Sequence, residues 1–255
     1  MVGRQAGRVV RSCPGTGGVM TDHTTDAGAR SDRGAGTAPG ALVLDVDGTL
    51  LDTNYLHVIA WWEAFRAAGH EVSGFDIHRA IGRGSGDLVE TLIGHEDESI
   101  VEGHAANWAP LREQCIPFHR VPELIRTCVE RGLRVVYCTS GAPEDVEDFR
   151  ERIGCDDVVS AVVNSSDVAR SKPEPDIVQA ALDAVGVPPE RAVMVGDTVY
   201  DVRAARAAGV TVVGLVCGGI SEQELREAGA DAVYGNVAEL VDGLDDSPVG
   251  RLFDA

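Results

Sequence analysis

The sequence predicts an α/β fold in which a parallel sheet core carries an inserted helical subdomain. Two observations lead to this prediction. Short apolar runs alternate with helical stretches from about residue 133 onward, a pattern typical of a parallel sheet with right-handed crossovers. A long strand-free stretch also separates the first apolar run, at 41–44, from the second, and it is too long for a simple loop.

The core strands are predicted from apolar runs that are bounded by turn residues. The first run, 41–44, reads Ala-Leu-Val-Leu and has the continuous apolar character of a buried parallel strand. Further strands are predicted at 133–139, 158–163, 192–195, 210–216 and 232–234. Helices are predicted between them at 144–153, 176–185, 201–208 and 222–228. This order makes the core Rossmann-like.

The strand-free stretch begins with a helix predicted at 54–68. Val58, Trp61, Trp62 and Phe65 recur at i, i+3, i+4 and i+7 and so form one apolar face. Residues 76–115 continue as helices with loops, and the glycine-rich segment 82–86 is a turn. The predicted domains are therefore a core, residues 41–54 and 121–255, and a helical cap, residues 55–120. Residues 1–40 lack a hydrophobic period and are predicted to be disordered.

Charge and composition exclude several classes of partner. The formal net charge is −19, and such an acidic surface repels nucleic acid and anionic membranes. No run approaches the roughly 18 apolar residues of a membrane span, and the basic N-terminal segment lacks the apolar centre of a secretory signal. The six cysteines form no CxxC pair. A cytoplasmic protein with reduced thiols is therefore predicted, and its oligomeric state stays open.

Polar residues follow three of the predicted strands. In an open parallel sheet, ligands bind beyond the carboxyl ends of the strands, so these residues are expected to meet at one edge. One further residue of this set, Lys172, is the only lysine in the chain, and an arginine is not equivalent to it in a tight site. The set is Asp45 and Asp47, then Thr139, Ser140 and Gly141, then Lys172, and finally Asp197 and Asp201.

This set fits phosphoryl transfer. Carboxylates this close together require a cation to stay ionised, and Mg²⁺ prefers oxygen ligands. The predicted metal ligands are Asp45, the backbone carbonyl of Asp47, and Asp197, with Asp201 orienting Lys172 or a metal-bound water. Asp45 is the predicted nucleophile, which would form an aspartyl-phosphate. Asp47 would act as the general acid and then the general base.

The remaining residues of the set would bind the phosphoryl group. The Thr139 hydroxyl and the backbone N–H groups of Ser140 and Gly141 are expected to hold its oxygens. Lys172 would bridge Asp45 and the phosphate, and so would supply the positive charge that an acidic surface otherwise lacks.

These residues resemble the four motifs of the haloacid dehalogenase superfamily, in its phosphatase branch. The run 45–50 matches the first motif, Thr139 the second, Lys172 the third and the run 196–201 the fourth. The resemblance covers about residues 41–240 in the expected order, and the roles that it implies agree with those given above. It implies a Mg²⁺-dependent phosphoric monoester hydrolase with an inserted helical cap, acting on a small phosphorylated metabolite.

A closer resemblance is to the subgroup of phosphoglycolate phosphatases and β-phosphoglucomutase, in Asp52-Thr53, His57 and Ala60-Trp61. It implies phosphoglycolate or a sugar phosphate as substrate. In the cap, His57 is a candidate substrate contact that could equally be a packing residue. Arg83 is a candidate for binding an anionic group and could equally be a surface arginine.

Two alternatives to a hydrolase stay open. The first is a phosphomutase of the β-phosphoglucomutase type, which the absence of any cap lysine makes less favoured. The second is a catalytically silent protein that binds phosphorylated ligands, against which the intact motifs weigh. Asp47 favours a phosphate ester over a halide, because a halide leaving group needs no proton.

Overall fold

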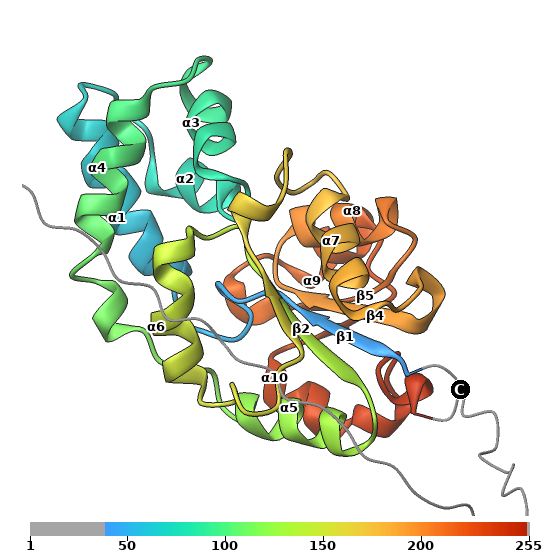
Figure 1. Cartoon of the computed structure of the whole chain (residues 1–255). Helices are drawn as coiled ribbons and strands as arrows, with labels where there is room; N and C mark the ends of the chain where they lie inside the picture. The colour runs from blue at the N-terminus through green and yellow to red at the C-terminus, as the bar shows by residue number, and fades with distance from the viewer. Residues whose placement is uncertain (1–38, 254–255) are drawn as a thin grey trace, which may run out of the picture. The chain divides into compact units, whose positions relative to one another are not determined.

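Six parallel strands form one sheet in the order β3-β2-β1-β4-β5-β6 in a computed structural model that describes residues 39–253 (Figure 1). The prediction of disorder for residues 1–40 therefore falls, except for its last two residues, outside the described part of the chain. The strands are β1 (Ala41–Leu44), β2 (Arg134–Cys138), β3 (Ala161–Val163), β4 (Ala192–Gly196), β5 (Thr211–Leu215) and β6 (Ala232–Tyr234).

Helices cover both faces of this sheet. Alternate residues of β1 show the arrangement: Leu42 and Leu44 belong to one buried cluster, and Ala41 and Val43 to another, as the two-residue period of a strand requires. The first cluster includes residues of α5 (Val121–Glu130), α6 (Pro143–Ile153) and α10 (Val237–Asp242). The second includes residues of α7 (Asp176–Val185), α8 (Val199–Ala207) and α9 (Glu222–Ala228). The predicted α/β parallel-sheet fold is thereby confirmed.

Within the described residues, four helices lie between β1 and α5 in the chain, and no strand interrupts them. They are α1 (Asn54–Ala67), α2 (Gly74–Ala80), α3 (Ser85–Ile93) and α4 (Glu98–Trp108), and residues 54–108 are called the helical insertion from here on. Figure 1 shows these helices grouped beyond the ends of the strands. Residues 39–253 all belong to one compact unit, so the division into a core and a cap stays a prediction.

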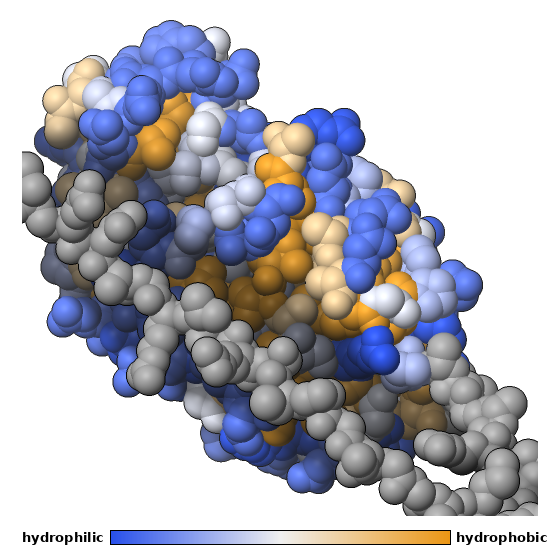
Figure 2. All heavy atoms as spheres, viewed as in Figure 1, coloured by the Kyte–Doolittle hydropathy of each residue, from blue (hydrophilic) through white to orange (hydrophobic). Residues whose placement is uncertain are grey.

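The helical insertion has its own apolar core, and the prediction that Trp62 belongs to its apolar face is wrong. Trp61 and Phe65 are buried in this core, whereas Trp62 is 39% exposed. Trp62 lies about 100° around the helix from Trp61, outside the stripe that faces α4. The Arg66 guanidinium stacks on its ring at 4.5 Å from the centroid instead. Over the insertion, Figure 2 shows a mainly hydrophilic surface.

Two element boundaries differ from the prediction by two residues or more, and others differ by one residue. β3 begins at Ala161 rather than at residue 158, because the N–H groups of Val158 and Val159 donate to the Cys155 carbonyl in a turn. α8 begins two residues early because the Thr198 side chain caps the helix at Asp201, a capping box that satisfies two free N–H groups. None of the helices described here has the length and apolar content of a membrane span.

Candidate active site

The sheet order brings the predicted residues to one edge. β1 lies between β2 and β4, and the three strands run in parallel register, with Leu44 level with both Tyr137 and Val195. Asp45, Thr139 and Asp197 each follow directly after one of these strands. Their side chains therefore lie close together at the point where the strand order reverses, between β1 and β4. Ligands usually bind at this point in such sheets.

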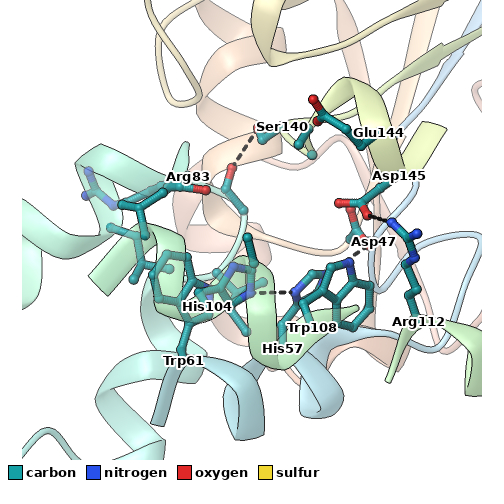
Figure 3. Close-up of a pocket in the computed structure, with 18 of the residues that line it drawn as sticks. Asp47, His57, Trp61, Arg83, His104, Trp108, Arg112, Ser140, Glu144 and Asp145 are labelled. Carbon is teal, nitrogen blue, oxygen red and sulfur yellow. Dashed lines mark hydrogen bonds and ion pairs between the residues drawn. The ribbon is translucent and has the colours of Figure 1, made fainter. Parts of the chain in front are cut away.

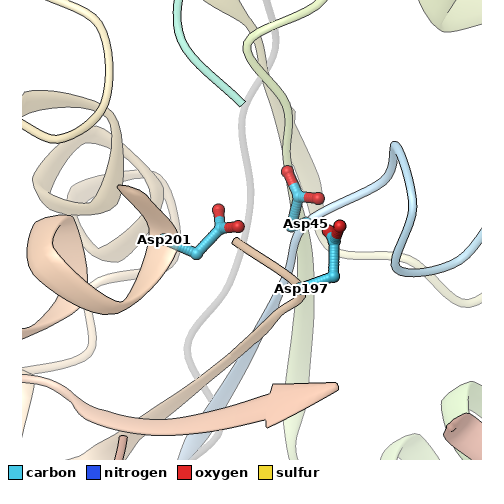
Figure 4. A group of neighbouring side chains, drawn as sticks. All are labelled: Asp45, Asp197 and Asp201. Carbon is cyan, nitrogen blue, oxygen red and sulfur yellow. The ribbon is translucent and has the colours of Figure 1, made fainter. Parts of the chain in front are cut away.

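Three buried carboxylates form a cluster at this edge. One oxygen from each of Asp45, Asp197 and Asp201 lies within 4.8 Å of the others, and all three residues are buried. Figure 4 shows the carboxylates of Asp45 and Asp197 beside each other, with Asp201 directed toward them from the start of α8. The Asp47 carboxylate is not part of this cluster, and only its backbone carbonyl was predicted as a metal ligand.

Lys172 is fully buried against this cluster. Its Nζ lies 2.5 Å from Asp45 Oδ1 and 2.8 Å from Asp201 Oδ1, and it also donates a hydrogen bond to the Cys138 carbonyl at 3.1 Å. Burial alone would lower the pKa of Lys172, but the charges of Asp201 and Asp45 raise it well above its usual value. The ammonium therefore stays charged, and Asp201 serves both as its partner and as the capping residue of α8.

One lysine does not balance three buried carboxylates. Burial raises the pKa of Asp45 to about 7, against the opposing effect of Lys172 and with further repulsion from Asp201 and Asp47. Burial, followed by the charges of Asp45 and Asp201, raises the pKa of Asp197 well above its usual value. A hard divalent cation would relieve this repulsion, and a set of carboxylate oxygens suits Mg²⁺. Asp45, Asp197 and Asp201 therefore fit a metal site by their chemistry.

Asp197 is held by residues that the sequence analysis did not single out. Thr49 Oγ1 donates to Asp197 Oδ1 at 2.8 Å, and Asn54 Nδ2 donates to Asp197 Oδ2 at 2.8 Å. The backbone also approaches closely, since a Cβ atom on Gly218 would lie 1.7 Å from Asp197 Oδ2. Gly48 has a φ of 75° and room for no side chain, which only glycine tolerates. Thr49 lies inside the first motif, whereas nothing in the sequence connects Gly218 to the site.

Asp47 is held by three hydrogen-bond donors. Thr53 Oγ1 lies 2.8 Å from Asp47 Oδ1, His57 Nε2 lies 3.3 Å from the same oxygen, and Thr139 Oγ1 lies 3.3 Å from Asp47 Oδ2. Burial raises the pKa of Asp47, but these three contacts, led by His57, outweigh it and lower the pKa overall. The carboxylate is therefore ionised and fixed beside the end of β2.

The groups of the Thr139 loop are hydrogen-bonded within the protein. The Gly141 N–H donates to Thr139 Oγ1 at 2.9 Å, so the Thr139 hydroxyl hydrogen is free to point at Asp47 or at a ligand. Ser140 Oγ donates to the Gly82 carbonyl of the helical insertion at 3.2 Å. The structure thus brings Thr139, Ser140 and Gly141 to the same edge as Asp45 and Asp47.

His57 is part of an aromatic stack. Its Nδ1 lies 3.2 Å from His104 Nε2, and its ring stacks on Trp108 with centroids 3.7 Å apart. The His104 ring in turn stacks on Trp61 at 3.8 Å. His104 and Trp108 were not predicted as site residues. Their spacing of four on α4 places them on one helix face, but a sequence alone does not show which face meets His57.

A cavity of about 350 Å³ opens from Asp45 and Asp47 between the helical insertion and the start of α6. His57, Arg83, Ser140 and Gly141 all line it. Figure 3 shows the Arg83 side chain extending away from Asp47, and its guanidinium lies over the Tyr200 ring, 4.4 Å from the centroid. The structure thus places Arg83 in the cavity wall, with its charged end on Tyr200.

Comparisons with known proteins agree with this geometry. A family profile for haloacid dehalogenase-like hydrolases matches residues 39–209. The chain is 29% identical to a phosphoglycolate phosphatase of Rhodospirillum rubrum, over 81% of this chain and 91% of that protein. It is 29% identical to an N-acetylmuramic acid 6-phosphate phosphatase of Pseudomonas aeruginosa, over 80% of this chain and 94% of that protein.

A solved structure is similar over nearly its whole length. It is a hydrolase from Pseudomonas syringae, which superposes with a TM-score of 0.76 at 32% identity and covers 81% of this chain and 98% of its own. The profile match extends over more than half of the chain and includes all four motifs. The chain therefore belongs to the haloacid dehalogenase-like hydrolase family, which confirms the family and the hydrolase class that the four motifs predicted.

Proposed function

We propose that this protein is a Mg²⁺-dependent phosphatase of a small phosphorylated metabolite, with phosphoglycolate and sugar phosphates as candidates. One observation carries the proposal: Asp45, Lys172, Asp197 and Asp201 form a buried charged cluster directly beside a cavity of substrate size. The relatives named as phosphatases support the reaction type. The relative named for N-acetylmuramic acid 6-phosphate supports a sugar phosphate as a candidate.

Asp45 is the proposed nucleophile. Its Oδ1 is held at 2.5 Å by Lys172, which leaves the other oxygen to attack the phosphorus of the ester. The P–O bond to the leaving alcohol breaks as the bond to Asp45 forms, giving an aspartyl-phosphate. Water then displaces phosphate from Asp45 and regenerates the free carboxylate.

Asp47 is the proposed general acid and base. Its carboxylate is ionised in the free site, but a phosphate dianion beside it would raise its proton affinity by like-charge repulsion. Asp47 would therefore take up a proton from solvent as the substrate binds, give it to the leaving alkoxide, and take one from the attacking water in the second step. Thr53 and His57 would hold Asp47 Oδ1 in place for both steps.

The phosphoryl oxygens would be held by Lys172, the Thr139 hydroxyl and the backbone N–H groups of the Thr139 loop. Asp45, Asp197 and the Asp47 carbonyl would hold the metal ion, and Asp201 would orient Lys172 or a metal-bound water. When bound, Mg²⁺ supplies positive charge that lets a carboxylate approach a phosphate dianion. The leaving alcohol would occupy the cavity beside His57 and Arg83.

The test is a screen of phosphate esters with Mg²⁺, followed by Asp45→Asn. The variant should release phosphate at less than about a thousandth of the wild-type rate, because an amide oxygen is a far poorer nucleophile. Asp183→Asn, an exposed aspartate on α7, is the matched control and should keep full activity. Wild-type turnover by the Asp45 variant would refute the assignment of Asp45 as the nucleophile. Full activity after chelation of Mg²⁺ would refute the requirement for a metal ion.

A further inference from the structure

The cavity beside Asp45 has an apolar wall and a charged wall. Trp61, Leu88, Val101 and Trp108 contribute the apolar wall from the helical insertion. Its volume of about 350 Å³ lies within the usual range of small-molecule sites, roughly 300–1,000 Å³. A leaving group the size of a sugar would therefore bury its apolar face here and present its polar groups to the opposite wall.

Among the cationic side chains that line the cavity, Arg112 and His57 already have polar partners, whereas Arg83 has no ion pair within the described residues. Arg112 lies 3.1 Å from Asp145 and 2.9 Å from Asp148, so two carboxylates share one guanidinium. Arg83 places its guanidinium over Tyr200, away from Asp47 (Figure 3). His57 uses both of its ring nitrogens, one on Asp47 and one on His104. Beside Asp145 and Glu144, a second anionic group of a substrate would meet Arg112, which two carboxylates already share, because the Arg83 guanidinium is directed toward Tyr200.

The charged wall instead offers hydrogen-bond acceptors. Asp145 lines the cavity, and Glu144 lies at its rim, exposed and without an ion pair to any other described residue. An ionised carboxylate only accepts hydrogen bonds, so its complement on a substrate is a hydroxyl or an ammonium group. A carboxylate or a second phosphate in the same place would be repelled and could not be hydrogen-bonded by these groups.

We infer that the leaving group is a polyhydroxylated or amine-bearing alcohol, such as a sugar or an amino sugar, without a second negative charge. This inference rests on the proposed phosphatase function and narrows its substrate class. It separates the candidates of that proposal, because phosphoglycolate carries a carboxylate and an unmodified hexose 6-phosphate does not. It also differs from the activity named for the Pseudomonas aeruginosa relative, because N-acetylmuramic acid carries a carboxylate. The inference assigns Glu144 as the residue that determines this specificity.

The test compares esters of matched size that differ in charge. One series is glucosamine 6-phosphate, glucose 6-phosphate and 6-phosphogluconate, and the other is phosphoethanolamine, ethylene glycol monophosphate and phosphoglycolate. With Mg²⁺ present, kcat/KM for the carboxylate member of each series should be about tenfold or more below that of the neutral member. The amine member should equal or exceed the neutral one.

A variant ties this preference to the cavity. Glu144→Gln keeps the size of the side chain and should lower the ratio of amine to carboxylate kcat/KM by about threefold or more at low salt. Glu147→Gln, an exposed glutamate on the same helix that does not line the cavity, is the matched control and should leave the ratio unchanged.

The possible results separate the two claims. A carboxylate member that is the best of its series, or equal to the others within twofold, would overturn the inference and leave the phosphatase proposal standing. An equal change of the ratio in both glutamate variants would also overturn it. No phosphate release from any of these esters, nor from p-nitrophenyl phosphate, would overturn the phosphatase proposal itself and the inference with it.

Discussion

His104 gives a prediction that links the packing of the helical insertion to pH. Its side chain is buried between Trp61 and His57. Burial, followed by the charge of His57, lowers the pKa of His104 to about 2, although Asp47 opposes the shift. An unfolded histidine has its ordinary pKa of about 6.5. The unfolded chain therefore binds a proton at this position over a pH range in which the folded protein does not.

The sign and size of the effect follow from this difference. Because the folded pKa is depressed, the stability is fully present above pH 6.5 and is lost as the pH falls toward 2. The loss approaches 1.4 kcal/mol for each pH unit below 6.5, so between pH 7 and pH 5 it amounts to about 2 kcal/mol. His104→Phe keeps a ring between Trp61 and His57 but removes the titration.

The assay is urea unfolding followed by circular dichroism at pH 7, 6 and 5. The variant starts less stable, because His57 Nδ1 loses its partner, but its free energy of unfolding should fall by about 2 kcal/mol less than that of the wild type. His95→Gln, at an exposed histidine, should keep the wild-type pH dependence. Parallel curves for His104→Phe and the wild type would refute the reasoning.

Three further variants test the cluster at the strand ends. The fully buried site of Lys172 has no room for the guanidinium of Lys172→Arg. This variant should lose activity, and its free energy of unfolding in urea should fall by about 3–5 kcal/mol. Arg170→Lys, on the surface, should keep both. Thr49→Val removes the hydrogen bond to Asp197 Oδ1; the Mg²⁺ concentration for half-maximal activity should rise about tenfold or more, and an unchanged value would show that Thr49 does not orient Asp197. Gly218→Ala places a Cβ 1.7 Å from Asp197 Oδ2; isothermal titration should show weakened Mg²⁺ binding, and wild-type affinity would contradict the close packing seen here.

The sheet was predictable because its strands are buried on both faces. A continuous apolar run such as 41–44 has few other stable environments in a chain of this kind, and the alternation with helices fixed the parallel order. Local chemistry then shifted the boundaries: the Thr198 cap started α8 early, and the turn at Cys155 shortened β3. The exposed Trp62 shows the limit of a periodic pattern, because the width of an apolar face depends on the helix packed against it.

The candidate site likewise contains residues that the sequence predicts and residues that it does not. Asp45, Thr139, Lys172 and Asp197 follow strands or carry a rare residue type, and both signals are local in sequence. The residues that hold these side chains in place are distant in the sequence. Gly218, for example, packs against the Asp197 side chain, and no spacing rule predicts that contact. His104 lies in no ligand pattern of the sequence, yet its hydrogen bond to His57 gives it a place beside the cavity.

Kinetic measurements on variants should therefore separate the role of the core from the role of the helical insertion. In the proposed mechanism, core residues such as Lys172 would contact the phosphoryl group, which all phosphate esters share, so their substitution should lower kcat/KM for every ester alike. Lining residues of the helical insertion would contact the leaving group, and their substitution should change the ratios between esters. Asp47 belongs to both sets, because Thr139 holds one of its oxygens from the sheet and His57 holds the other from the insertion. A substitution of His57 should consequently change both the rate for all esters and the ratios between them, which no other residue of the aromatic stack should do.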